Sequence, residues 1–270
     1  HEETPCGYSQ YYLLVTYAGL GHRPEAEQCY ETFAVGLNAS QSIVVNQVMA
    51  NMYLKRQEWT LCQSYIDRSK ALEPSPSELA TLLYLELSLV KAQSQFERMQ
   101  DVARQIVEIE PSVLSYLNWM TAFYFANQPP GLARIYDLYL QFASQNNPTL
   151  TPSEVSSLFG LQCWMWSRLG QFEAVVEEYN KLIPQFLEVE SPYFIDSRVP
   201  AAVVQANLQL NRAEEALERG KEFQHVFKLA KSKLEDPDFY QSLALAYFRT
   251  GNVEMANKTL VDGRSLCKDH

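Results

Sequence analysis

The chain has 270 residues, of which 47% are hydrophobic, and its 22 Lys and Arg against 32 Asp and Glu give a formal net charge of −10. This much apolar material excludes an intrinsically disordered chain. The acidic balance argues against a protein that neutralises phosphates or anionic lipid. No apolar run approaches the roughly 20 residues that span a bilayer, so any membrane association is expected to be indirect.

An internal repeat begins near the N-terminus. There Tyr17, Gly21, Ala26 and Tyr30 place a large residue, a glycine, a small residue and a second large residue at fixed offsets. Six further segments follow these offsets with substitutions: Tyr53, Gln57, Cys62 and Ile66; Val90, Ser94, Met99 and Ala103; Tyr124, Gln128 and Ala133; Trp166, Gly170, Val175 and Tyr179; Asn207, Asn211, Ala216 and Gly220; Tyr247, Gly251, Ala256 and Leu260. Their first members are 36, 37, 34, 42, 41 and 40 residues apart, which predicts one helical hairpin per interval.

The offsets fit a pair of packed helices. The large residues belong to the core, the glycine position ends the first helix, and the small residue lets the second helix approach the first closely. The segment 151–154, Thr-Pro-Ser-Glu, is typical of a helix start, and Pro74, Pro111 and Pro148 fall where a second helix has just ended. No stretch alternates with a two-residue period between hairpin turns, so the sequence predicts an all-α fold.

We therefore expect a single α-solenoid domain over residues 1–270, built from about seven helical hairpins. Their approximate ranges are 7–40, 43–76, 80–113, 114–148, 152–188, 197–233 and 237–270. In such a fold each hairpin buries its apolar face against its neighbours.

The repeat resembles the tetratricopeptide repeat (TPR) family, whose pattern of Tyr, Gly, Ala and a large hydrophobic residue is often closed by Pro. The best matches run from Tyr17 to Tyr30, Tyr53 to Pro74, Trp166 to Tyr179 and Tyr247 to Leu260. The segment from Gly131 to Tyr139 is equally similar to the pentatricopeptide family, so the subtype stays open. Either resemblance implies an α-α superhelix whose concave face holds protein segments or braces a larger assembly.

One branch of the TPR family clamps the C-terminal carboxylate of a peptide with Lys and Asn side chains on the concave face. The positions expected on that face are Tyr11, Val15, Gln47, Asn51, Asn118 and Ala122, with no matching pair of lysines among them. This clamp is therefore not expected, and Gln47 and Asn51 are kept as candidate polar contacts with a partner protein.

Residues suited to catalysis or metal binding are scarce. The four histidines belong to no HExxH pattern, and the five cysteines form no CxxC pair, which favours a reducing compartment over a disulfide framework. Phosphate-binding glycine motifs and the GxSxG nucleophile elbow are also missing from the sequence. We expect no enzymatic activity, metal, cofactor or small-molecule substrate; an enzyme with an unfamiliar site in the groove is the minor alternative.

Two tryptophans and one basic cluster are further candidate contacts with a partner. Trp119 and Trp164 each lie among other large residues, not all of which can face the core, and Trp is enriched at binding hot spots. Burial between hairpins is the alternative for both. Arg219, Lys228 and Lys231 would suit an anionic partner, with a solvated helix face as the alternative because acidic residues follow them.

The sequence thus predicts a non-enzymatic scaffold, a structural subunit of a larger complex that binds other protein subunits. The alternative is a pentatricopeptide-like organellar RNA-binding protein, in which each hairpin reads about one base. The acidity and the irregular repeat spacing argue against nucleic acid. Because the sequence begins at His1, we expect either a trimmed form or a mature form that has lost a leader. With one pentatricopeptide-like unit, the expected compartment is the mitochondrion, with the cytoplasm as the alternative.

Overall fold

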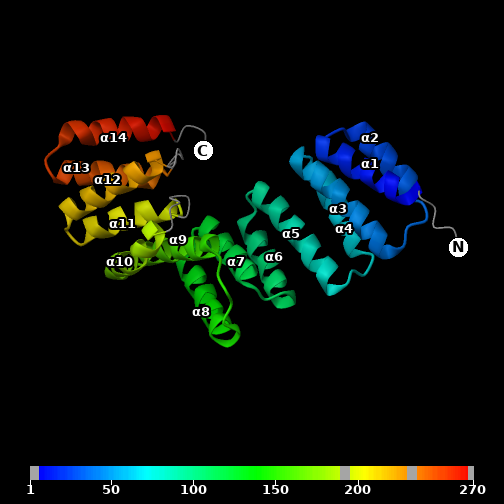
Figure 1. The fold of residues 1–270 in the computed structure, drawn as a ribbon, viewed down its shortest axis with the longest axis horizontal. Helices are drawn as coiled ribbons and strands as arrows, with labels where there is room; N and C mark the ends of the chain where they lie inside the picture. The colour runs from blue at the N-terminus through cyan, green and yellow to red at the C-terminus, as the bar shows by residue number, and fades with distance from the viewer. Residues whose placement is uncertain (1–5, 189–194, 230–235, 267–270) are drawn as a thin grey trace. The chain divides into compact units, whose positions relative to one another are not determined.

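The computed structural model describes residues 6–188, 195–229 and 236–266, and every regular element within these ranges is an α-helix. The all-α prediction is therefore confirmed. The helices are α1 (Cys6–Leu20), α2 (Arg23–Phe33), α3 (Ala39–Lys55), α4 (Trp59–Lys70), α5 (Pro76–Ala92), α6 (Phe96–Ile109), α7 (Val113–Phe125), α8 (Pro129–Asn146), α9 (Pro152–Arg168), α10 (Phe172–Glu188), α11 (Arg198–Gln209), α12 (Ala213–Leu229), α13 (Pro237–Arg249) and α14 (Val253–Leu266) (Figure 1). None of these helices is both long enough and apolar enough to cross a bilayer.

The helices pack mostly in sequential pairs. The most extensive contacts join α1 to α2, α3 to α4, α5 to α6, α11 to α12 and α13 to α14. This arrangement is consistent with a helical repeat. The chain divides into two compact units, residues 1–122 and 123–270. A single solenoid over the whole chain stays a prediction.

A residue in the left-handed conformation ends the first helix of each pair. The φ angles are 75° at Gly21, 61° at Gln57, 55° at Ser94, 52° at Asn127, 75° at Gly170, 59° at Asn211 and 83° at Gly251. The amide of the next residue then donates to the carbonyl oxygen of the repeat's first member, as from His22 to Tyr17 (2.8 Å) and from Asn252 to Tyr247 (2.9 Å). This Schellman pattern satisfies carbonyls that the helix end would otherwise leave unpaired.

The fourth pair departs by one residue from the predicted register. The positive φ falls on Asn127, and the amide of Gln128 donates to the carbonyl oxygen of Phe123 (3.0 Å). The repeat members are therefore Phe123, Asn127 and Leu132, and the prediction of Tyr124, Gln128 and Ala133 was wrong. Asn adopts the left-handed conformation more readily than Gln does, which is the physical reason for the shift.

The predicted small residues Ala26 and Ala256 are buried near the starts of their second helices. Ala26 is fully buried, and Ala256 is 6% exposed. The backbone amide of each donates to the residue after the left-handed position, at 3.0 Å from Ala26 to His22 and 3.1 Å from Ala256 to Asn252. The small position therefore lies one turn into the second helix, against the first.

Replacing Ala26 by Leu is expected to lower the free energy of unfolding of the first unit by about 1 to 3 kcal/mol, because the buried position has no room for the added carbons. Urea unfolding of Ala26→Leu and Ala256→Leu measures this. Ala39→Leu, at an exposed position, is the control and should change little. Unaltered stability in both buried variants would contradict the register.

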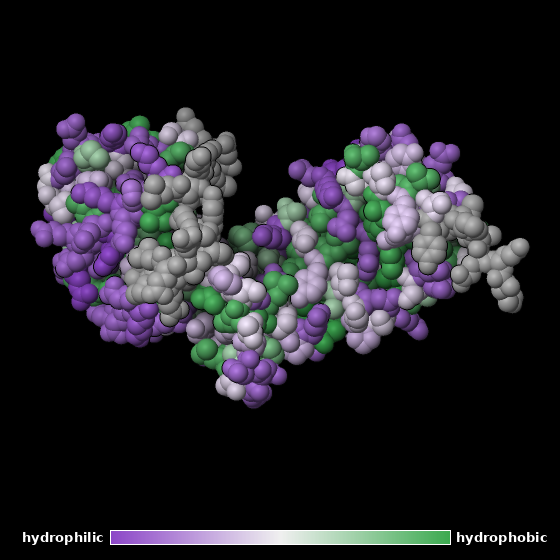
Figure 2. Space-filling view, in the orientation of Figure 1, coloured by the Kyte–Doolittle hydropathy of each residue, from purple (hydrophilic) through white to green (hydrophobic). Residues whose placement is uncertain are grey.

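The second unit is organised around α11, which contacts α9, α10, α12 and α13. Its core contains the buried rings of Tyr179, Phe223 and Phe239. The close packing of α12 against α13 depends on Gly220: a Cβ there would lie 2.4 Å from Leu243 Cδ1. Hydrophobic residues also reach the surface of each unit, as the green areas of Figure 2 show.

Candidate partner-binding site

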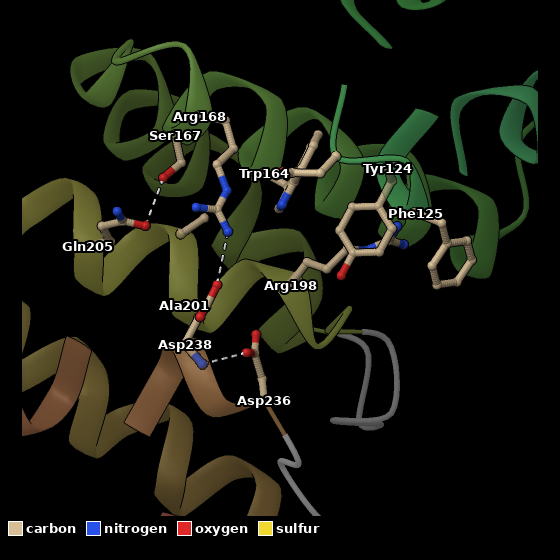
Figure 3. A pocket seen from close by; sticks show the side chains of 12 residues that line it. Tyr124, Phe125, Trp164, Ser167, Arg168, Arg198, Ala201, Gln205, Asp236 and Asp238 are labelled. Carbon is tan, nitrogen blue, oxygen red and sulfur yellow. Dashed lines mark hydrogen bonds and ion pairs between the residues drawn. The ribbon is translucent and has the colours of Figure 1, made fainter. Parts of the chain in front are cut away.

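A pocket of about 280 Å³ opens in the second unit beside the N-terminal end of α11 (Figure 3). Its walls come from the end of α7, the C-terminal half of α9, the start of α11 and the start of α13. The lining residues are Tyr124, Phe125, Asn127, Trp164, Ser167, Arg168, Arg198, Ala201, Ala202, Gln205, Asp236 and Asp238. The pocket thus joins segments that lie far apart in the sequence.

One wall consists of two aromatic rings. Tyr124 and Trp164 meet edge to face, with ring centroids 5.0 Å apart and an interplanar angle of 76°. Both side chains are half-buried. Trp164 lies two residues before the repeat position Trp166 on α9, whereas the neighbouring Cys163 and Met165 face the core. The helical period thus leaves the Trp164 ring at the pocket.

Arg198 supports this wall from α11. Its Nε and one terminal nitrogen donate to the two oxygens of Asp196 at 2.7 and 2.6 Å, and its guanidinium carbon lies 5.0 Å from the centre of the Tyr124 ring. Burial alone would lower the pKa of Arg198, but Asp196 and Tyr124 raise the pKa above its usual value. Gly160 makes room for Asp196, since a Cβ at position 160 would lie 2.5 Å from the Asp196 carboxylate.

A second ion pair lies beside Trp164. Arg168 donates to a carboxylate oxygen of Asp238 at 3.1 Å, and its guanidinium carbon lies 5.9 Å from the Trp164 ring centre. Beside it, the Ser167 hydroxyl donates to the side-chain carbonyl oxygen of Gln205 at 3.1 Å, as Figure 3 shows. Each pocket arginine therefore already has a carboxylate partner.

Asp236 is the N-cap of α13. Its carboxylate accepts a hydrogen bond from the backbone amide of Asp238 at 2.9 Å. Burial raises the pKa of Asp236 to about 6, and the nearby charge of Asp238 acts in the same direction. The carboxylate is therefore ionised at neutral pH at a cost in stability.

Asp236→Asn is expected to raise the free energy of unfolding at pH 7.5 by about 1 kcal/mol, because Asn keeps the cap and removes the desolvated charge. The pKa of Asp236 is higher in the folded than in the unfolded chain, so the folded chain holds the proton more tightly. Stability in the wild type should thus fall as the pH rises from about 4 to about 6 through this group.

Urea unfolding of both proteins at pH 5 and pH 7.5 tests this prediction. The gain from Asp236→Asn should be larger at pH 7.5 than at pH 5. Asp262→Asn, at an exposed position on α14, is the control and should show no such difference. An Asp236→Asn variant that is less stable than wild type at pH 7.5 would refute the prediction.

The pocket presents residue types that are common at protein–protein binding sites. Trp, Tyr and Arg are the residues most enriched at binding hot spots, and α7, α9 and α11 present them to the pocket. The thiol of Cys163, next to Trp164 on α9, is fully buried, and burial raises its pKa well above the usual value, which makes it a poor nucleophile. Within the ranges that the structure describes, no three His, Cys, Asp or Glu side chains are grouped to hold a metal ion.

Among the predicted contact residues, the structure places Trp164 in the pocket. Trp119 lies in the first unit and packs, partly buried, against the cluster around Leu83 and Met99. Gln47 and Asn51 are both on α3, where Gln47 is half-buried and Asn51 is exposed. The sequence therefore identified one member of the pocket.

Arg219 and Lys228 of the basic cluster do not line the pocket. Arg219 pairs with Glu222 at 2.9 Å and lies 5.6 Å from the Tyr179 ring centre. Lys228 is exposed near the end of α12. Lys231 lies outside the described residues.

Sequence reasoning missed Tyr124, Arg168, Arg198, Asp236 and Asp238. Two signals were present: Tyr124 is one of three consecutive aromatic residues in 123–125, and Asp196 lies two residues before Arg198. Neither signal says which helices come together. No family model matches this chain, and no curated protein matches it.

Proposed function

We propose that this chain is a non-catalytic protein–protein interaction subunit of a larger assembly, and that it holds a segment of a partner protein in the pocket beside α11. The observation that carries the proposal is the pocket wall of Tyr124 and Trp164, a concave, half-buried aromatic surface held in place by Arg198. Such a wall removes a large apolar area of a partner from water at little cost in side-chain entropy.

The paired arginines favour protein over RNA as the partner. Aromatic rings and arginines also stack on single-stranded bases, which supports the pentatricopeptide-like alternative. An RNA phosphate, however, would compete with Asp196 for Arg198 and with Asp238 for Arg168. The pocket is therefore unfavourable for a polyanion.

The proposal is tested by purifying tagged wild-type protein and Trp164→Ala from the source cells, each with and without nuclease. The proteins that co-purify are quantified by mass spectrometry. Trp119→Ala is the matched control, because it removes the same side chain at a position outside the pocket. Circular dichroism establishes that both variants are folded.

We expect at least one protein at stoichiometric amount that survives nuclease treatment. Its recovery should fall by tenfold or more with Trp164→Ala, as for a hot-spot residue worth about 2 kcal/mol, and stay unchanged with Trp119→Ala. Partners retained by Trp164→Ala would refute the pocket as the binding site. Release of all partners by nuclease would favour the RNA-binding alternative.

A further inference from the structure

The last hairpin, α13 with α14, exposes large apolar side chains on its outer side. Phe248 on α13 is 60% exposed. On α14, Val253 and Leu260 lie seven residues apart, on one face of the helix, and are 52% and 38% exposed. The α13–α14 hairpin therefore presents apolar side chains to water.

In the preceding hairpin, α11 with α12, the equivalent face is covered by a helix. By the repeat offsets, Phe248 corresponds to Leu208 of α11 and Leu260 to Gly220 of α12. Leu208 is 2% exposed and Gly220 is buried. The helix that approaches this side is α13, whose Leu243 packs against Gly220. The exposed face of α13 and α14 is therefore the counterpart of a surface that, one hairpin earlier, receives a helix.

The first helix, α1, exposes the surface that corresponds to the one by which α13 packs on α11 and α12. Leu13 has the same repeat offset as Met49, Val203 and Leu243, all three of which are fully buried. Leu13 itself is 46% exposed, and Leu20, seven residues later on the same face, is 66% exposed. No residue between Cys6 and Leu20 is charged, so the helix lacks the polar face of a solvated surface helix.

We propose that these two surfaces bind each other between copies of this chain: α1 of one copy packs on α13 and α14 of a second copy, in the place that α13 takes on α11 and α12. The inference is independent of the pocket. It follows from the packing of α13 on α11 and α12. The surface that α13 contributes there has an exposed counterpart on α1, and the surface that receives α13 has an exposed counterpart on α13 and α14. In the internal junction each kind of surface packs on the other kind. A symmetric dimer would instead pair α1 with α1, or α13–α14 with α13–α14, and would not reproduce that packing.

Such an interface is heterologous, because the two contacting surfaces differ. Each added copy leaves one further α1 and one further α13–α14 surface open, so the assembly grows instead of stopping at a dimer. The average mass should therefore rise continuously with protein concentration.

The test is sedimentation velocity of the 270-residue chain over a wide range of concentrations, with Leu13→Glu and Phe248→Glu as variants. Each substitution places a charge in one of the two surfaces. Val44→Glu and Leu140→Glu are the matched controls, since both replace an exposed apolar residue elsewhere on a helix. Leu20→Glu, at a residue that is 66% exposed on the same face of α1, replaces Leu13→Glu if that variant does not fold.

The wild type and both controls should associate, and each end variant alone should stay monomeric, with an apparent dissociation constant raised at least tenfold. A one-to-one mixture of Leu13→Glu and Phe248→Glu should form a dimer and nothing larger, because it holds one intact α1 and one intact α13–α14 surface. A wild type that is monomeric throughout overturns the proposal, and so does a mixture that stays monomeric.

Discussion

Replacing Lys70 and Arg98 together by Met is expected to lower the free energy of unfolding of the first unit by about 3 to 5 kcal/mol. The carboxylate of Glu86 on α5 is 6% exposed and accepts hydrogen bonds from the ammonium of Lys70 at the end of α4 and the guanidinium of Arg98 on α6. Without the two cations, the buried carboxylate of Glu86 would have neither water nor an opposite charge around it, which destabilises the folded state. The three helices would thus lose their shared ion pairs.

Adding Glu86→Met to the double variant should restore most of the lost stability. The repeat offset of Glu86 is that of Met49, Val203 and Leu243, which are buried hydrophobic residues in other hairpins. Replacing a buried ion cluster by packed apolar side chains is commonly neutral or stabilising. The junction is therefore expected to accept Met at position 86.

Urea unfolding of the wild type, the double variant and the triple variant measures both effects. Lys55→Met, which removes an exposed charge at the end of α3, is the control and should change little. A double variant as stable as the wild type would mean that Glu86 is solvated. A triple variant no better than the double would mean that the site does not accept an apolar side chain.

The helix ends were predictable because they depend on local sequence. The predicted turn positions Gly21, Gly170 and Gly251 have positive φ, and so do the less obvious Gln57, Ser94 and Asn211. Likewise, the predicted helix start at 151–154 is a capping box, in which Thr151 accepts from the amide of Glu154 at 3.3 Å. Each of these interactions is made within one turn of chain.

The register of the fourth hairpin was missed because two aromatic residues compete for one position. Phe123 and Tyr124 both fit the large slot, and the offsets then place either Asn127 or Gln128 at the turn. The preference of Asn for positive φ distinguishes the two, and it was given too little weight. The one-residue shift also determines which aromatic residue is at the site: Phe123 takes the core position, and Tyr124 lines the pocket.

The pocket could not be predicted because its residues meet only through tertiary packing. Trp164 and Arg198 come from α9 and α11, and Asp236 lies at the start of α13. Nothing local distinguishes the pairing of Arg198 with Asp196 from an ordinary surface ion pair. What makes it part of a site is the ring of Tyr124 above it and the room left by Gly160.

Gly263→Ala is expected to lower the free energy of unfolding of the second unit by about 2 to 3 kcal/mol, although Ala favours helix by about 1 kcal/mol over Gly. A Cβ at position 263 would lie 2.6 Å from Cβ and 2.7 Å from Cγ of Tyr240 on α13. Because the Cβ of Tyr240 moves only with its backbone, α13 and α14 would have to separate. The substitution should also loosen the α13–α14 surface proposed to bind a second copy.

Gly19→Ala is the matched control, since Gly19 is also helical and a Cβ there would meet nothing within 4 Å. That variant should be more stable than wild type by about 0.5 to 1 kcal/mol, from the helix preference alone. Opposite signs for the same substitution at the two glycines would establish that close helix approach, and not backbone freedom, requires Gly263. A stabilised Gly263→Ala would mean that the two helices of the last hairpin can separate at no cost.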